Sequence, residues 1–398
     1  MSSPDTVVEL LSRLVAIPSV NPMGRDLEGP EFFEGRMVEY LLHFFAELGV
    51  PHEEIPVVPG RSSNVLARLD APGSSQTILM DAHMDTVPVE GMTIPAFGGE
   101  VRDGRVRGRG SCDVKGGLAA MLWAFRRLVR ERPSGMPNVV MSCTCDEEAT
   151  TLGINHLVRA WDDGRSKLIT SAPDGAIIAE PTELDVVVAH RGAVRFKIRT
   201  FGRACHSSDP TQGLNAIYRM GRVVTALEAY APKLSASRES HPLVGPPTLS
   251  VGRIYGGASV NVVPDECTIE IDRRLIPGDR SGEAIQDIRE FLNGRLDFEV
   301  EFDPPWLCSP TLDDDDNEWL AEAMLSCIEP VAGPHKSLGV PYGTHASRTC
   351  AAGVPSIVFG PGSIEQAHTK DEWIDIDQLE KACEIYYRFC ADPPRTPA

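Results

Sequence analysis

Histidines and carboxylates occur repeatedly in this sequence at the point where an apolar, strand-like run ends. These groups are, in chain order, His83 with Asp85, then Asp146-Glu147-Glu148, then Glu180, and last His368. A single His-x-Asp pair after a strand is most simply a turn with a surface histidine. Here four strand-like runs each end in such residues, which instead indicates one shared site made of side chains that ligate metals or transfer protons.

The ends of parallel strands bring such side chains together, because ligands of open α/β sheets bind beyond the carboxyl ends of the strands. With Asp113, which follows a glycine-rich segment, these groups would form a dense acidic cluster. Carboxylates a few ångströms apart raise one another's pKa, so the cluster needs protons or cations. Histidine and carboxylate ligands suit Zn²⁺, with Mn²⁺ or Co²⁺ as alternatives. Two histidines and three acidic ligands suffice for two divalent ions when one carboxylate bridges them.

The elements that would hold these residues alternate between helices and strands. Apolar periodicity predicts helices over 5–16, 30–48, 118–131, 152–160, 315–328 and 377–390. Apolar runs predict strands over 63–70, 77–82, 138–145, 176–179 and 354–359. This alternation predicts an α/β domain with a mostly parallel sheet flanked by helices.

Between about residues 185 and 302 the pattern changes to a period of two, which is typical of antiparallel, half-solvated strands. Helices are expected over 213–230 and 281–293. We therefore expect an inserted α+β domain over residues 188–302, with a four-stranded antiparallel sheet and two helices. The catalytic domain would comprise residues 1–187 and 303–398.

The composition argues against several classes of partner. The 57 acidic and 38 basic side chains give a formal charge of −19, which repels nucleic acid and anionic membranes. The first residues lack a basic segment followed by an apolar one, and no apolar run is long enough to span a bilayer. The ten cysteines contain no CxxC pair, and Cys143 and Cys145 are expected to be buried thiols. These features favour a cytoplasmic protein.

Five sequence blocks resemble the two-zinc family of acetylornithine deacetylase, succinyl-diaminopimelate desuccinylase, aminoacylase and glutamate carboxypeptidase. The blocks occur in the family's order: Asp81-Ala82-His83-Met84-Asp85-Thr86-Val87-Pro88, Gly108-Arg109-Gly110-Ser111-Cys112-Asp113-Val114-Lys115-Gly116-Gly117, Asp146-Glu147-Glu148, Ala179-Glu180-Pro181-Thr182, and Ala367-His368. The resemblance covers nearly the whole chain. It implies a zinc-peptidase-like catalytic domain and makes the inserted segment a lid and dimerisation domain.

The resemblance also implies roles for the clustered residues. One metal ion would be held by His83, Asp113 and Glu180. The other would be held by Asp113, Glu148 and His368, so that Asp113 bridges. Asp85 is expected behind His83, accepting the second ring N–H. Glu147 would be the general base, taking a proton from a water held between the two metals.

By the same resemblance, His206 would reach the active site from the partner subunit of a homodimer and stabilise the oxyanion. Asn261 and Arg274 match positions that bind the substrate's carboxylate, and the Gly343-Thr344 backbone would line the same pocket. Without these motifs, His206 would be taken as structural and Arg274 as a surface strand residue.

The implied activity is hydrolysis of a linear amide bond in N-acyl-amino acids. A metallo-carboxypeptidase or dipeptidase acting on a short peptide is the alternative, and a non-catalytic metal-binding scaffold is a more remote one. The presence of Glu147 argues against the scaffold, which needs no base. At position 345 this chain has His where many relatives have an acid. That change either alters substrate preference or has no effect.

Overall fold

The computed structural model describes residues 3–237 and 240–391, so the ends of the predicted catalytic domain, including the N-terminal residues Met1 and Ser2, lie outside the described residues. The chain forms two compact units. Unit 1 comprises Met1–Val188, Asp314–Leu338 and Thr344–Ala398, and unit 2 comprises Ala189–Asp313 and Gly339–Gly343.

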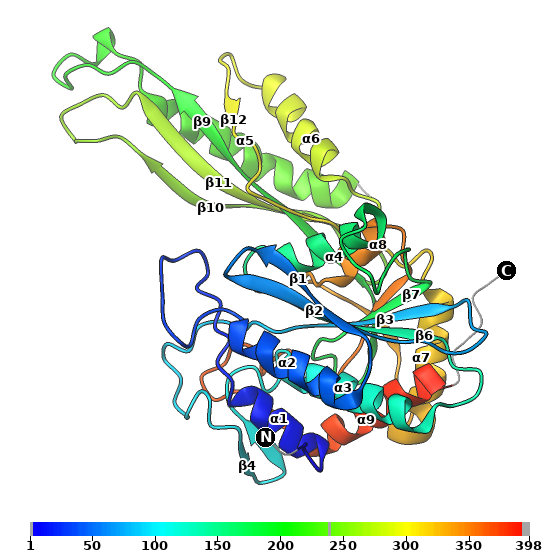
Figure 1. Cartoon of the computed structure of the whole chain (residues 1–398). Helices are drawn as coiled ribbons and strands as arrows, with labels where there is room; N and C mark the ends of the chain where they lie inside the picture. Colours follow the sequence, from blue (N-terminus) through cyan, green and yellow to red (C-terminus); the bar gives the residue numbers. More distant parts are fainter. Residues whose placement is uncertain (1–2, 238–239, 392–398) are drawn as a thin grey trace. The chain divides into compact units, whose positions relative to one another are not determined.

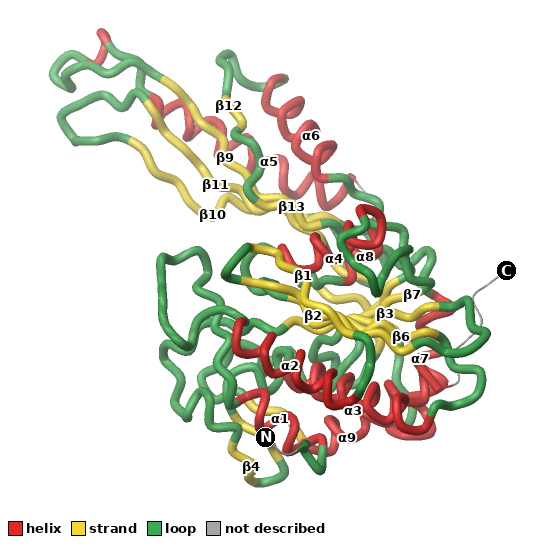
Figure 2. Tube along the Cα trace, viewed as in Figure 1, coloured by secondary structure: helices red, strands yellow, loops and turns green. Residues whose placement is uncertain are grey.

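The large sheet has eight strands (Figures 1 and 2). Their spatial order is β1 (His52–Val58), β2 (Ser62–Leu69), β6 (Asn138–Thr144), β3 (Thr77–His83), β7 (Gly175–Ile178), β15 (Ser356–Val358), β8 (Val186–His190) and β14 (Ser337–Val340). The central strands β6, β3, β7 and β15 run parallel, whereas β1 and β2 pair antiparallel with each other, β2 pairs antiparallel with β6, and β8 pairs antiparallel with β15. The predicted fold class is thus confirmed, and the carboxyl ends of β3, β6 and β7 share one edge.

Helices cover both faces of this sheet (Figure 1). One face packs against α1 (Val7–Val15), α2 (Gly35–Leu48), α3 (Lys115–Glu131), α7 (Glu318–Ala332) and α9 (Ile376–Ala391). The other face is covered by α4 (Leu152–Asp163) and α8 (Ala346–Ala351). Phe45 and Phe125 meet edge-to-face in the core between helices, with ring centroids 5.9 Å apart. Such aromatic pairs add to the free energy gained by burial.

Local sequence explains where α1 and α2 begin and end. The Thr6 side chain accepts a hydrogen bond from Glu9 N at 3.1 Å and caps α1. Helix α2 begins at Gly35, five residues later than predicted, because Phe33 has a φ of 61°, outside the helical region. The helix ends at Leu48 and is capped by Gly49, whose φ of 67° is the left-handed conformation that glycine adopts without steric cost.

A small three-stranded sheet joins the glycine-rich segment to the C-terminal region. It contains β4 (Glu100–Arg102), β5 (Arg105–Arg107) and β16 (Trp373–Asp375), with β5 in the middle. The antiparallel pairing of Trp373 with Arg107 places these distant parts of the chain side by side.

Unit 2 contains an antiparallel sheet with two helices on one face (Figure 1). Its elements are β9 (Gly192–Phe201), α5 (Ala216–Ser237), β10 (Thr248–Gly256), β11 (Glu266–Leu275), α6 (Ser281–Asn293), β12 (Glu301–Phe302) and β13 (Leu307–Ser309). The sheet has five strands, and the predicted number of four was wrong. The short strands β12 and β13 share one edge of β9, and such short segments carry little periodic signal.

None of the helices in the described part of the chain is long and apolar enough to cross a membrane.

Candidate metal centre

The five predicted metal ligands come together in unit 1, at the carboxyl edge of the parallel strands. His83 ends β3, Glu180 follows β7, and Glu148 lies in the turn after β6. Asp113 precedes α3, and His368 precedes β16. Ligand atoms of His83, Asp113 and Glu180 lie within 4.8 Å of one another, and so do those of Asp113, Glu148 and His368.

Asp113 is common to both groups of ligands, and its two oxygens face different histidines. The distance from His83 Nε2 to Asp113 Oδ1 is 3.2 Å, and that from His368 Nε2 to Oδ2 is also 3.2 Å. His368 Nε2 lies 3.2 Å from Glu148 Oε2. Zinc bonds of about 2.0–2.2 Å place the ligand atoms of a tetrahedral site roughly 3.3 Å apart. The donor set therefore fits two divalent ions that share Asp113.

The Asp85 carboxylate holds the turn that presents Glu147 and Glu148. It accepts hydrogen bonds from Glu147 N at 3.0 Å and Glu148 N at 3.1 Å. Towards His83 the arrangement differs from the predicted one. His83 Nδ1 lies 3.0 Å from the Asp85 carbonyl oxygen and 3.5 Å from its carboxylate. Because a carbonyl oxygen only accepts, Nδ1 carries a proton and Nε2 is the nitrogen available to a metal.

Burial and like charge dominate the electrostatics of the cluster. Burial raises the pKa of Glu147 to about 8, and burial with the nearby Asp113 raises that of Glu148 to about 7. The pKa of Glu180 is raised well above its usual value for the same two reasons. Burial opposes the charge on Asp113, but hydrogen bonds from His368 and His83 hold its pKa below the usual value. The two histidines thus supply too little positive charge to neutralise the carboxylates of the cluster.

Two further residues support this edge and were not anticipated from the sequence. Asn21 Nδ2 donates to Asp85 Oδ2 at 2.9 Å and to Asp146 Oδ1 at 3.0 Å. Glu34 accepts hydrogen bonds from Ser62 Oγ at 2.8 Å and from Asp146 N at 3.1 Å. Both come from the N-terminal segment, where no local pattern marks them as part of a distant site.

His345, the departure noted in the sequence, is buried at 1% exposure. Its Nδ1 donates to Asp81 Oδ2 at 3.0 Å, and Thr144 Oγ1 donates to the same carboxylate at 3.1 Å. The imidazole therefore compensates a buried carboxylate two residues before His83. This arrangement favours a structural role for His345 over direct contact with a substrate.

The predicted substrate residues of unit 2 fall into two places. Ser207 N donates to the Asn261 carbonyl at 3.0 Å, so the segments carrying His206 and Asn261 are adjacent. These segments adjoin the start of β11, where Gly202 N donates to the Asp265 carbonyl at 2.7 Å. Arg274 lies near the other end of that strand, with its Nε 2.8 Å from Asp272 Oδ1.

Gly343 and Thr344 lie where the chain passes from unit 2 back to unit 1. Gly343 is exposed, whereas Thr344 is buried and its Oγ1 accepts a hydrogen bond from Ala346 N at 3.2 Å. The Thr344 side chain thus caps the turn into α8.

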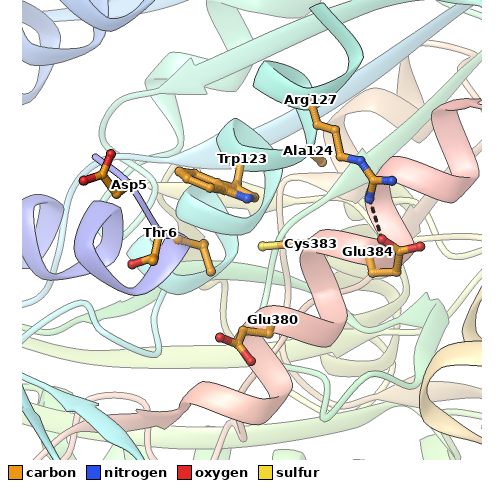
Figure 3. Close-up of a pocket in the computed structure, with 9 residues that line it drawn as sticks. Asp5, Thr6, Trp123, Ala124, Arg127, Glu380, Cys383 and Glu384 are labelled. Carbon is orange, nitrogen blue, oxygen red and sulfur yellow. Dashed lines mark hydrogen bonds and ion pairs between the residues drawn. The ribbon is translucent and has the colours of Figure 1, made fainter. Parts of the chain in front are cut away.

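A separate hollow of about 310 Å³ lies among α1, α3 and α9 (Figure 3). Asp5, Trp123 and Glu380 line it, and Arg127 points to Glu384, with 2.6 Å between Nη1 and Oε2. None of the candidate site residues lines this hollow. We assign it no part in the chemistry.

Comparison with known proteins decides the family. The acetylornithine deacetylase of Pectobacterium carotovorum subsp. carotovorum (strain PC1) is 31% identical over 406 residues, which cover 96% of this chain and 97% of that protein. The sequence model of peptidase family M20/M25/M40 matches residues 79–392. The chain belongs to peptidase family M20/M25/M40. It is therefore a member of a family of metal-dependent hydrolases, as its motifs predicted.

Two solved structures share the fold. The aminopeptidase PepT of Bacillus cereus ATCC 10987 has a TM-score of 0.75 at 21% identity, and covers 97% of each chain. A Bacillus subtilis protein described as a dinuclear metal-binding peptidase of the M20 family has a TM-score of 0.70 at 15% identity, and covers 98% of each chain. At these identities the similarity establishes the fold alone.

Metal uptake by this M20 chain is expected to release protons. In the metal-free protein, hydrogen bonds with Asp113 and Glu148 raise the pKa of His368 to about 10, while the pKa of Glu148 is about 7. Both groups must lose their protons to ligate, so raising the pH favours the metal-bound state. The apparent zinc affinity should rise from about pH 7 towards pH 10. Calorimetric titration in two buffers of different ionisation enthalpy gives the proton count.

His368→Gln should lower the number of protons released. The control is His43→Gln, which removes an exposed histidine that pairs with Glu47 at 3.1 Å on α2. Its proton count should equal that of the parent. Zinc uptake without proton release would contradict the assignment of His368 as a ligand.

Proposed function

We propose that this chain is a metal-dependent hydrolase of linear amide bonds in N-acyl-amino acids, similar to acetylornithine deacetylase and succinyl-diaminopimelate desuccinylase. The observation that carries the proposal is the pair of ligand groups sharing Asp113, with Glu147 beside them. The full-length similarity to acetylornithine deacetylases supports an N-acyl-amino acid as the substrate class.

The five ligands suit two divalent ions, with zinc favoured and cobalt or manganese as alternatives. His83, Asp113 and Glu180 would hold one ion, and Asp113, Glu148 and His368 the other. When bound, the ions supply Lewis acidity that makes a water a nucleophile at neutral pH and polarises the substrate carbonyl.

Glu147 is proposed as the general base. It accepts a proton from the attacking water, whose oxygen bonds to the amide carbon. The C–N bond then breaks as the proton passes from Glu147 to the departing nitrogen. The second proton of the water then moves from the new carboxylic acid to the amine, so the products are a carboxylate and an ammonium group. Asp85 supports this step by anchoring Glu147 N at 3.0 Å.

His206 is proposed to donate a hydrogen bond to the oxyanion of the tetrahedral intermediate. Ser208 N donates to His206 Nδ1 at 3.1 Å, so in the neutral ring the proton is on Nε2. The exposed Nε2–H is thus available as a donor. Asn261 and Arg274 are proposed to bind the substrate carboxylate, and the Gly343-Thr344 backbone to line the pocket.

The positions of these residues within unit 2 support a homodimer. Eight residue steps along β11 separate Glu266, near the His206 segment, from Arg274, a distance of about 26 Å in an extended strand. One copy of unit 2 therefore cannot offer both His206 and Arg274 to the same small substrate. A second copy resolves this, and β10 is an exposed edge strand with Ile254 and Tyr255 on its surface. Unit 2 would then act as the lid and dimerisation domain.

The same residues would also hydrolyse a peptide bond, so a metallo-carboxypeptidase or dipeptidase is the alternative. The presence of Glu147 beside the ligands argues against a non-catalytic scaffold. We place the protein in the cytoplasm, where its buried Cys143 and Cys145 thiols would stay reduced.

A substrate panel tests the proposal on zinc-loaded protein. N-acetyl- and N-succinyl-amino acids are expected to give a kcat/KM roughly tenfold or more above that of dipeptides, because an N-acyl-amino acid is the proposed substrate class. Faster cleavage of dipeptides would establish the peptidase instead. If zinc-loaded protein hydrolyses neither class of substrate, that result would support the non-catalytic metal-binding scaffold.

Glu147→Ala is expected to retain the fold and bound metal but lose turnover by about 10²–10⁴-fold, the usual contribution of a positioned base. Metal content, circular dichroism and kcat on the best substrate measure these effects. The matched control is Glu90→Ala, which removes a surface carboxylate paired with Arg25 and should turn over at the parental rate. A parental rate in Glu147→Ala would exclude Glu147 as the base.

Mixing two inactive variants tests whether His206 acts across subunits. His206→Ala and Glu147→Ala should each lose most activity as pure dimers. A mixed dimer contains one site with an intact Glu147 and the partner's intact His206, so co-expression should restore part of the activity. If the mixture stays as inactive as its parents while sedimentation shows mixed dimers, His206 does not act across the subunit interface.

A further inference from the structure

Glu372 is a buried carboxylate whose two oxygens both face the segment that carries Asp113. Its Oε2 accepts hydrogen bonds from Arg109 Nη1 at 2.6 Å and Gly110 N at 3.1 Å. Its Oε1 accepts from Cys112 N at 2.9 Å and Asp113 N at 3.0 Å. The side chain is 0% exposed. One carboxylate therefore satisfies four donors of a single short segment.

The backbone around Glu372 strengthens this connection. Gly108 N donates to the Glu372 carbonyl at 3.0 Å, and Trp373 pairs with Arg107 in the small sheet. Gly110 has a φ of 81°, and a Cβ there would lie 2.7 Å from Thr86 Cγ2. Both the positive φ and the short distance to Thr86 thus require glycine at position 110, where the backbone directs its amides towards the Glu372 carboxylate.

The charge of Glu372 is balanced by Arg109, which is itself 3% exposed. A buried ion pair adds little to stability, because desolvation offsets most of the attraction. The location of this ion pair matters more than its contribution to stability. The Glu372 carboxylate also accepts hydrogen bonds from backbone amides of the segment that carries Asp113. Hydrogen bonds from N–H groups to a charged carboxylate are short and strong.

The segment fixed by Glu372 ends at the carboxylate shared by both ligand groups. Asp113 N is held by Glu372, while the Asp113 side chain lies 3.2 Å from both His83 Nε2 and His368 Nε2. Glu372 itself follows His368 by four residues. Glu372 therefore connects the segment that carries Asp113, the shared ligand, to the segment that carries His368, the most exposed of the five ligands.

We propose that Glu372 is a positioning residue that sets the separation of Asp113 and His368 and so determines the metal affinity of the centre. The proposal rests on the metal centre described above. Glu372 is not itself a ligand, because all four contacts of its oxygens are to protein donors and it belongs to neither ligand group of the described residues.

Glu372→Gln tests this role with little change in shape. An amide NH₂ would replace one acceptor and face either Arg109 and Gly110 or the Cys112 and Asp113 amides, so donors would oppose donors. Zinc affinity should fall by roughly 10–100-fold, as for other residues that orient metal ligands. Competition with a chromophoric chelator measures the affinity, and thermal unfolding of the metal-free protein measures the fold.

The matched control is Glu384→Gln. Glu384 Oε2 also accepts from an arginine at 2.6 Å, between α3 and α9, but holds no backbone amide of the Asp113 segment. It should leave zinc affinity at the parental value. A parental affinity in folded Glu372→Gln, or an equal loss in Glu384→Gln, would overturn the proposal.

If Glu372→Gln fails to fold, Glu372→Asp keeps the charge opposite Arg109 but is one methylene too short to reach all four donors. It should fold and bind zinc more weakly than the parent, and parental affinity would refute the role of Glu372. A parent that takes up no zinc would instead refute the metal centre and the proposed function.

Discussion

Mutual repulsion among buried carboxylates is the constraint on which the rest of this structure depends. Glu147, Glu148 and Glu180 are all held at raised pKa by burial and by one another or Asp113. Two histidines offset only part of this charge. Such an arrangement is costly in a folded protein unless cations enter it, so the charge of the cluster is consistent with a metal-binding site.

The fold keeps these charges together by attaching each to rigid backbone. Parallel pairing aligns the ends of β3, β6 and β7 at one edge, so ligands arrive from separate strands at the same place. Carboxylates that are not ligands then hold the turns between them. Asp85 accepts the amides of Glu147 and Glu148, and Glu372 accepts those of the Asp113 segment. Preorganisation of this kind avoids a reorganisation cost during the reaction.

In unit 2 the length of the β-strands limits which residues can reach the same substrate. The long strands of this unit separate the His206 and Asn261 segments from Arg274, although we propose that all three act on one substrate. The strand rise is a fixed property of the extended backbone, so no side-chain rearrangement can close the gap. This separation is the reason for proposing a homodimer, in which two chains together would complete one site.

The sequence by itself determined the family, the fold class and the set of residues that gather at the strand ends. These features are local, since each ligand follows a recognisable run or motif. Only the tertiary structure decided which groups hold the ligands in place. Glu372 lies 259 residues from Asp113, Asn21 lies 64 from Asp85, and His345 lies 264 from Asp81. The two-residue β12 also exists only by pairing with β9. Hydrogen-bond partners so far apart in sequence leave no periodic trace, because folding alone brings them into contact.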